Sequence, residues 1–119
     1  MNKRKIGTLY ENMVCSFLEE KGMIILERNF VSKKGEIDII AKDGTCTVFI
    51  EVKYRSNKQF GNPIEAVTEN KKIRICQTAA YYCVKHREVK EIRYDVIGIM
   101  GNEIVWIPNA FNHRGYCFI

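Results

Sequence analysis

Residues 35–55 decide the fold of this chain, and they read GEIDIIAKDGTCTVFIEVKYR. The Asp43-Gly44 pair lies between two runs rich in β-branched and aromatic residues, a pattern that predicts a β-hairpin. Charged side chains interrupt these strand-like runs at Asp38, Glu51 and Lys53. Because a charge in an apolar strand is costly to bury unless it is paired or bound to a metal, these three residues need their own explanation.

Two registers of this hairpin are open. A tight turn at the Asp-Gly pair places Asp38 opposite Phe49, whereas a slip of two residues places Asp38 directly opposite Glu51. Side chains alternate between faces along a strand, so both registers put Asp38, Glu51 and Lys53 on one face. A slip of one residue is disfavoured, because it would expose the aliphatic face of the first strand. We therefore expect two carboxylates and an amine to converge on one patch.

The composition is that of a soluble globular protein. Of the 119 residues, 46% are hydrophobic and 28% are charged, so we expect a single domain over residues 1–119. No apolar run is long enough to span a membrane, and no signal-peptide core follows the basic N-terminus, so we expect a cytoplasmic protein without membrane contact. Lysine and arginine number 19 against 14 acidic residues, and the net charge of +5 is compatible with a polyanionic partner.

The cysteine and histidine pattern argues against two kinds of site. The five cysteines include no Cys-x-x-Cys pair, and only two histidines are present. A disulfide framework and a structural zinc site are therefore not expected, and the cysteines are interpreted as buried or incidental thiols in a reducing cytosol.

Periodicities on either side of the hairpin predict the remaining elements. The second helix begins with Asn62 as N-cap and Pro63 at the first helical position. Its length allows a crossover to a parallel strand. We therefore expect an α/β fold in the order αβββαββ, with a mixed central β-sheet flanked by helices. The expected elements are a helix over about 6–21, a strand over 23–30 with the chain turning out at 28–29, the hairpin, a single helix over 62–85, and strands over 91–100 and 103–107.

Several charged residues outside the hairpin fall at unusual positions. Glu11 lies on or beside the buried stripe of the first helix, and it is either a boundary residue paired with a lysine or a site carboxylate. Lys71 lies on the buried row of the second helix, which is unusual for a lysine. The adjacent Lys72 is interpreted as part of a solvated helix face. Asp95 is interpreted as a structural residue that pairs with Arg93 or Lys71. Residue 36, a glutamate on the acidic face of the hairpin, is either a further ligand or structural.

The hairpin charges suggest a hydrolytic chemistry. Two carboxylates about 4 Å apart repel by about 4 kcal/mol at an effective dielectric of 20, so they hold a shared proton, a lysine or a divalent cation. Hard oxygen ligands suit Mg²⁺ or Mn²⁺, which also bind substrate phosphates. Lys53 can orient or deprotonate a water, or stabilise charge on a phosphorane-like transition state. A surface strand pair with a Glu–Lys salt bridge would match the same spacing.

The resemblance of the chain to a known family is specific. Residues 35–40 and 48–55, GEIDII and VFIEVKYR, resemble the signature of PD-(D/E)xK nucleases. Nearly the whole chain is similar to the YraN-like family of small bacterial proteins. The matching segments are Gly7 with Glu11, ERNF at 27–30, FGNP at 60–63, EAV at 65–67 with Lys71, RYDV at 93–96 and NAF at 109–111.

This resemblance implies a restriction-endonuclease-like fold related to Holliday-junction resolvases. It implies that Asp38 and Glu51 ligate Mg²⁺, that Lys53 assists the attacking water, and that Glu11 completes the acidic site, so that these four residues form the catalytic set. The implied reaction is hydrolysis of phosphodiester bonds in DNA, with branched or damaged DNA as the candidate substrate. A homodimer is implied by analogy with the resolvases.

Four further residues are expected to contact DNA, namely Arg55, Lys71, Lys72 and Gln77. Gln77 and Tyr81 also resemble the Gln-x-x-x-Tyr helix motif of RecB-like nucleases. In one position the chain departs from the family pattern, because Tyr10 replaces the second glycine of Gly-x-x-Gly-Glu. A bulky ring beside the first-helix glutamate alters helix packing or substrate access. The alternative functions are a catalytically silent nucleic-acid-binding or adaptor module with the same fold, and an interaction protein without a nucleic-acid role.

Overall fold

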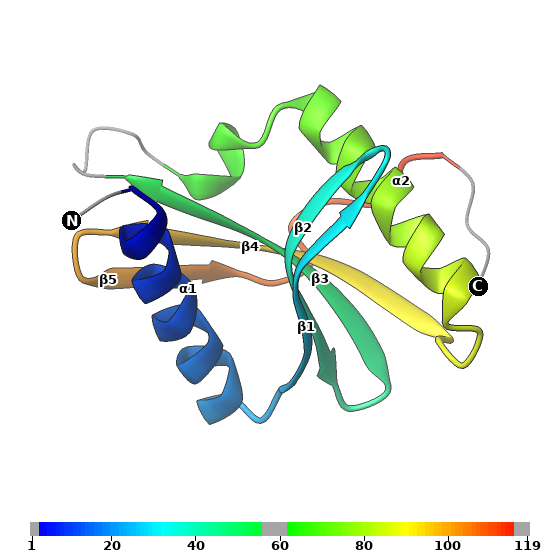
Figure 1. Cartoon of the computed structure of the whole chain (residues 1–119), viewed down its shortest axis with the longest axis horizontal. Helices are drawn as coiled ribbons and strands as arrows, with labels where there is room; N and C mark the ends of the chain where they lie inside the picture. The colour runs from blue at the N-terminus through cyan, green and yellow to red at the C-terminus, as the bar shows by residue number, and fades with distance from the viewer. Residues whose placement is uncertain (1–2, 56–61, 116–119) are drawn as a thin grey trace.

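The computed structural model describes residues 3–55 and 62–115, without the side chains at positions 3–6 and 55. The predicted order αβββαββ is confirmed, with one short 3₁₀ helix added before the second α-helix (Figure 1). The elements are α1 (Lys3–Glu20), β1 (Ile24–Ser32), β2 (Gly35–Asp43), β3 (Cys46–Arg55), η2 (Pro63–Ala66), α2 (Glu69–Lys85), β4 (Glu91–Met100) and β5 (Glu103–Ile107).

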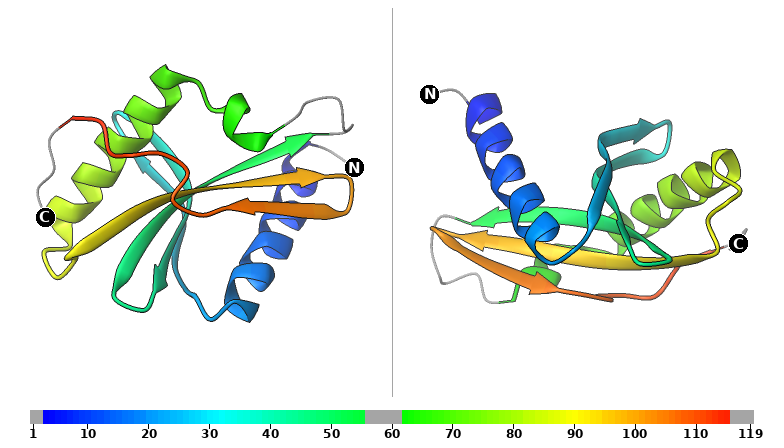
Figure 2. Two further views of the ribbon diagram at one scale, coloured as in Figure 1. Left: turned by 180° about the vertical axis from the view of Figure 1, so that it is seen from behind. Right: turned by 90° about the horizontal axis from the view of Figure 1, so that it is seen from below.

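The five strands form one mixed sheet, as predicted. Their order is β1-β2-β3-β4-β5, and β3 and β4 pair in parallel while the other neighbours are antiparallel. The segment with η2 and α2 makes the crossover that a parallel pair requires. Figure 2 shows the same sheet from behind and from below, with α1 and α2 lying over different parts of it.

Alternate side chains of the central strands supply two separate cores. Val48 and Ile50 of β3 pack with Val14 and Leu18 of α1, whereas Phe49 of β3 packs with residues of α2. This division follows from the two-residue repeat of a strand, and it means that both faces of β3 are covered. The next residue on the α2 side is Glu51, so its carboxylate points into the layer between the sheet and α2.

The turn of the central hairpin resolves the register. Asp43 pairs with Cys46, and Ile39 pairs with Ile50, which is the register slipped by two residues. The turn therefore uses Gly44 and Thr45, with Gly44 at φ +62°, a value that glycine adopts without steric cost. Continuing this register places position 38 opposite position 51.

The β1–β2 hairpin bends at Asn29. This residue has φ +54° and lies between two regular pairs, Arg28 with Ile39 and Phe30 with Ile37. The expectation that the chain turns out at residues 28–29 is wrong, because β1 continues to Ser32. Asn29 instead redirects the strand so that the end of the hairpin lies against α2 in Figure 1, where Phe30 meets the Tyr82 ring at 5.4 Å between centroids.

The expected single helix over 62–85 is also corrected. Asn62 caps only η2, whose four residues end before a second N-cap, Thr68, accepts a hydrogen bond from the Lys71 N–H at 3.2 Å. Two capping residues six positions apart therefore start two helices. Pro63 of η2 packs directly on β4, where a Cβ placed on Gly98 would lie 2.2 Å from the proline Cγ.

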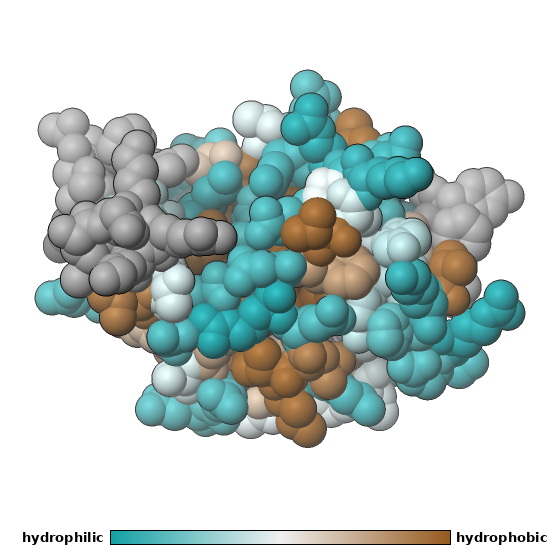
Figure 3. Space-filling view, viewed as in Figure 1, coloured by the Kyte–Doolittle hydropathy of each residue, from teal (hydrophilic) through white to brown (hydrophobic). Residues whose placement is uncertain are grey.

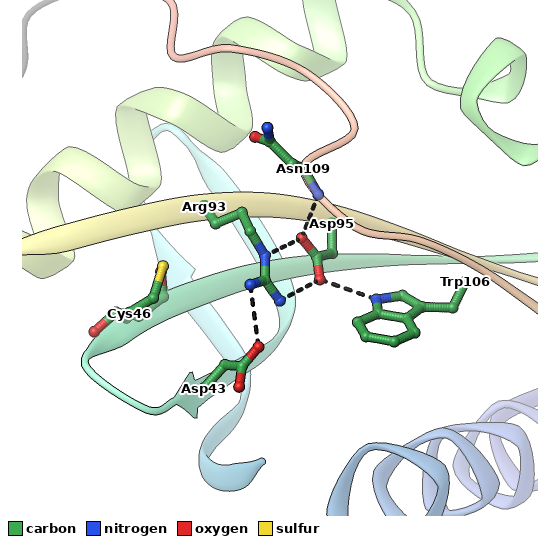
Figure 4. A network of polar contacts seen from close by, with 7 residues as sticks. Asp43, Cys46, Arg93, Asp95, Trp106 and Asn109 are labelled. Atoms are coloured by element: carbon green, nitrogen blue, oxygen red, sulfur yellow. Dashed lines mark hydrogen bonds and ion pairs between the residues drawn. The ribbon is translucent and has the colours of Figure 1, made fainter. Parts of the chain in front are cut away.

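A buried polar network joins β4, β5 and the segment after β5 (Figure 4). Asp95 is fully buried and accepts hydrogen bonds from Arg93 Nε and Nη2, Trp106 Nε1 and the Asn109 N–H. Arg93 also donates to Asp43 at 3.1 Å. The interpretation of Asp95 as a structural residue paired with Arg93 agrees with this arrangement.

The surface is mixed in polarity. Figure 3 shows one face that is largely hydrophilic, with several separate hydrophobic patches among its coloured residues. Scattered hydrophobic side chains of this kind are normal on a soluble surface and need no dedicated partner. Within residues 3–55 and 62–115, no helix combines the length and the apolarity that crossing a membrane demands.

Candidate functional site

The candidate site lies where β2 and β3 separate. Their regular pairing stops at Ile39 and Ile50, and the Val52 N–H beyond it donates to Asp38 Oδ2 at 2.8 Å. The Asp38 side chain thus replaces a backbone carbonyl as the acceptor at the point where β2 bends away. A carboxylate in the middle of a strand is accommodated here because the strand pairing itself is interrupted.

Glu51 lies on β3, on the other side of this separation, and two lysines contact it. Its side chain is only 4% exposed, and its Oε2 is 3.7 Å from Lys53 Nζ and 3.4 Å from Lys71 Nζ. Lys53 comes from the same face of β3, and Lys71 comes from the first turns of α2. The structure therefore brings together Asp38, Glu51, Lys53 and Lys71, which we call the acidic cluster with its two lysines.

The two carboxylates of this cluster are coupled. Burial, a hydrogen bond with Glu51 and the Glu51 charge together raise the pKa of Asp38 to about 8, although the Val52 N–H and Lys71 act in the opposite direction. Asp38 therefore holds a proton near neutral pH, next to the Glu51 carboxylate. A divalent cation could take the place of this proton, because it would relieve the same repulsion.

Glu11, on α1, is held by residues outside this cluster. Its Oε1 accepts from Arg28 Nε at 2.7 Å and from Asn29 Nδ2 at 3.0 Å. Both of these partners belong to β1, the strand that pairs with β2, where Asp38 lies. Within the described parts of the chain, no three His, Cys, Asp or Glu side chains form a group that could hold a metal ion.

The residues expected to contact DNA lie in different places. Lys71 belongs to the acidic cluster, whereas Lys72 places its Nζ 5.6 Å from the centre of the Phe111 ring. Gln77 is exposed and lines a groove of about 650 Å³ on the outer side of α2, together with Tyr81. Arg55 ends β3, but its side chain lies outside the described residues.

Two tyrosines stand next to site residues in the sequence. Tyr10 precedes Glu11 on α1, and Tyr54 follows Lys53 on β3. Their rings stack with centroids 4.3 Å apart and planes 27° from parallel. Tyr10 departs from the family pattern in its sequence alone, but its partner Tyr54 follows only from the packing of α1 on β3.

The contacts of Glu11 with Arg28 and Asn29, and of Lys71 with Glu51, were also not predicted from the sequence. Arg28 and Asn29 were interpreted as the start of a turn, and the ERNF segment gave no indication that both would bind Glu11. The unusual helical position of Lys71 was the signal that it would face the sheet, but it had been grouped with the DNA-contacting residues. Glu36 is exposed at the end of β2, so its carboxylate is open to solvent.

This arrangement of two carboxylates and two lysines can bind cations and exchange one cation for another. Two coupled carboxylates are flanked by Lys53, which is 25% exposed, and Lys71, which is 38% exposed, so solvent reaches the cations above a buried acid pair. Such an arrangement can bind a small hard cation and place an ammonium group next to it.

Comparison with known proteins places the chain among relatives of nearly the same length. The model of uncharacterised protein family UPF0102 matches residues 10–99, a span that contains Glu11, Asp38, Glu51 and Lys53. A UPF0102 protein from Dictyoglomus turgidum is 44% identical, over 93% of this chain and 100% of the relative. Relatives from Lachnoclostridium phytofermentans and Coxiella burnetii are 43% and 41% identical, over 97% and 90% of this chain and 99% and 92% of their own lengths.

Proposed function

This chain belongs to the uncharacterised protein family UPF0102, and we propose that it is a metal-dependent endonuclease of the PD-(D/E)xK type that hydrolyses phosphodiester bonds in DNA. One observation carries the proposal: the Asp38 and Glu51 carboxyl groups meet at the separation of β2 and β3, and Lys53 Nζ lies 3.7 Å from Glu51. A salt bridge with a structural role alone would need only the Glu51 carboxylate and would not require Asp38 beside it.

The donor set fits Mg²⁺ or Mn²⁺. Mg²⁺ is held by one or two carboxylates together with waters and substrate phosphates, so the Asp38–Glu51 pair is sufficient on the protein side. When bound, the ion supplies charge neutralisation at the phosphate and lowers the pKa of a water. The proton that Asp38 now holds leaves on binding, because the cation and the proton compete for the same oxygens.

Lys53 and Lys71 have separate roles in this proposal. Lys53 Nζ, 3.7 Å from Glu51, orients the attacking water or stabilises the negative charge that develops on the phosphate. Lys71 neutralises Glu51 in the absence of a cation, since its Nζ is 3.4 Å from the carboxylate. When a cation takes over this carboxylate, Lys71 is available to contact a DNA phosphate.

Glu11 has a supporting role. Its carboxylate is anchored by Arg28 and Asn29, so it contributes negative charge to the site or contacts the metal through a water. We assign the direct ligands to Asp38 and Glu51, because these two carboxylates already interact.

DNA is the proposed substrate, with branched or damaged forms as the candidates. The net charge of +5 favours a polyanion, and Lys72, Arg55 and Gln77 are the proposed contacts away from the acidic cluster. A homodimer is proposed only by analogy with resolvases, which cut two strands of a junction.

A cleavage assay tests the function. The chain is incubated with a four-way junction, a flap and a linear duplex, in Mg²⁺, Mn²⁺ or EDTA. We expect metal-dependent cleavage that falls by about 100-fold or more in Asp38→Asn and in Lys53→Ala. The matched controls are Glu65→Gln and Lys42→Ala, which change exposed residues outside the cluster and should leave the rate unchanged. Cleavage that survives both site substitutions removes the assignment.

The alternative is a nucleic-acid-binding module without catalysis. It is favoured by the charge balance of the cluster, because Glu51 already has two lysine partners and Glu11 has Arg28. This function predicts DNA binding that weakens steeply with salt, needs no metal and is never followed by cleavage.

A further inference from the structure

We propose that Tyr54, stacked on Tyr10, is a platform for an unpaired base of the DNA strand whose phosphate lies at the acidic cluster. This inference rests on the proposed function and deepens it, because it names the substrate class as DNA with an unpaired nucleotide next to the phosphate that is cut. Neither tyrosine belongs to the set of residues expected to bind metal or DNA from the sequence.

The stack itself is built to present one aromatic face. The two ring centroids are 4.3 Å apart with planes 27° from parallel, so Tyr10 supports Tyr54 from one side. Tyr10 is half-buried, whereas Tyr54 remains 42% exposed. A partly exposed aromatic ring held in place by a second ring is suited to stacking with bases, as aromatic side chains do in proteins that bind single strands.

The position of the stack links it to the acidic cluster. Tyr54 directly follows Lys53 on β3, and neighbouring residues of a strand point to opposite faces. Since β2 pairs with β3 only as far as Ile50, the β2-side edge of β3 is not covered by that strand at either residue. A DNA strand that reaches this edge can place a phosphate near Lys53 and the adjoining base against Tyr54.

The chemistry of stacking selects unpaired nucleotides. A base inside a duplex already stacks on its neighbours and pairs with its partner, so moving it onto a tyrosine requires that both contacts be broken. A base in a bulge, a flap or a junction has lost some of these contacts beforehand. The platform therefore favours such substrates over an intact duplex without reading their sequence.

A packing contact between α1 and β3 is the competing explanation for the tyrosine stack. Packing alone predicts that loss of the Tyr54 ring lowers stability and leaves every DNA preference unchanged. Tyr54→Phe offers a matched control, because it keeps the aromatic ring and removes only the hydroxyl group.

Photochemical crosslinking tests the proposal on the unsubstituted chain. The probe is a duplex with a single bulged 5-iododeoxyuridine, bound in EDTA so that no cleavage occurs, irradiated and mapped by mass spectrometry. We expect the adduct on Tyr54, because this base crosslinks to the aromatic ring on which it stacks. An adduct that maps to Tyr81 or to another element, or no binding at low salt, overturns the proposal.

Affinity measurements give the second readout. The dissociation constants of the bulged and the fully paired duplex are compared by fluorescence anisotropy. We expect Tyr54→Leu to reduce the preference for the bulge by about 10-fold, while Tyr54→Phe retains it. An unchanged preference in Tyr54→Leu refutes the platform, and if this variant does not fold, the crosslink on the unsubstituted chain decides.

The failures of the two proposals are distinguishable. Metal-dependent cleavage combined with a crosslink elsewhere refutes the platform alone. A crosslink at Tyr54 in a chain that cuts no DNA refutes the nuclease and leaves the platform as part of a binding module.

Discussion

Two buried acidic sites in this molecule are built in opposite ways. Asp95 is completely enclosed, and its two oxygens receive hydrogen bonds from Arg93, Trp106 and the backbone of Asn109. Asp38 receives one backbone hydrogen bond and otherwise faces another acid, Glu51. The Asp95 carboxylate is therefore fully hydrogen-bonded and paired with Arg93. Asp38, in contrast, keeps its proton up to about pH 8.

This difference separates structural from functional use of a carboxylate. A buried charge with a full set of donors stabilises one arrangement, and it has no capacity for a ligand. A coupled acid pair has unused oxygen ligands and gains from a cation, so perturbed carboxylates of this type mark candidate sites. Asp95 is fully buried, whereas Asp38 is only partly buried beside the buried Glu51, and the partners of the two aspartates differ as well.

The largest expected effect concerns the Asp95 site. Asp95→Ala removes the partner of the part-buried Arg93, and we expect the free energy of unfolding to fall by about 4 kcal/mol in urea denaturation. Asp38→Asn should cost less than about 1 kcal/mol at pH 7, because the amide replaces a carboxyl that already holds a proton. Equal losses in both variants would erase the distinction between the two sites.

The next effect is stabilisation by metal. At a Mn²⁺ concentration of 100 times the dissociation constant, the folded chain should gain about 2.7 kcal/mol, measured as a rise in Tm. Asp38→Asn should abolish this rise, whereas Glu65→Gln should keep it, since residue 65 lies on η2 and is exposed. A rise of equal size in Asp38→Asn would show that the ion binds elsewhere.

A pH dependence of stability follows from the raised pKa of Asp38. The unfolded chain releases this proton near pH 4, whereas the folded chain keeps it up to about pH 8. The folded state therefore binds more protons within this window, and without metal the contribution to stability is full below about pH 4 and is lost as the pH rises through 8. Within the window we expect the free energy of unfolding to fall by about 1.4 kcal/mol for each pH unit.

The slope of stability against pH provides the measurement. Unfolding curves are recorded in EDTA from pH 5 to pH 8.5 for the unsubstituted chain and for Asp38→Asn. The substitution should flatten the slope, because an amide does not titrate in this range. A slope that persists in Asp38→Asn would assign the coupled proton to a different group.

The smallest effect concerns Glu11. Arg28→Ala removes an ion pair whose arginine side chain is 37% exposed, so the loss of stability should be only about 0.5 kcal/mol. With Arg28 absent, the glutamate is less restrained, and Mn²⁺ affinity should rise about twofold, measured by calorimetry. Adding Glu11→Gln should cancel the rise, and a rise that remains would exclude Glu11 as its source.

Much of the fold was predictable because it follows from local patterns. Val14 and Leu18 on α1 marked a buried stripe at helical spacing, and the alternating residues of β3 marked its two faces. The prediction of a single helix over 62–85 is wrong because Thr68 was not identified as a second N-cap. The prediction of a turn at 28–29 is wrong because an asparagine with a left-handed backbone conformation inside a strand has the same local sequence signal as a turn.

The candidate site was predictable only in part, for a similar reason. Alternation placed Glu51 and Lys53 on one face, and the hairpin register limited where Asp38 could lie. No pattern within one strand or helix specified that Lys71 would reach Glu51 or that Arg28 would take Glu11. These contacts join residues 17 or more positions apart, so they depend on how elements pack.

The sequence by itself therefore determined which side chains share a face of each element, because the repeats of helix and strand are local properties of the backbone. It also placed two acids and an amine in the hairpin that dominates the sheet. Only the tertiary structure decided which of these acids would be coupled. The pairing of β2 with β3 ends at Ile39 and Ile50, so the Val52 N–H donates to Asp38, and Glu11 is held by Arg28.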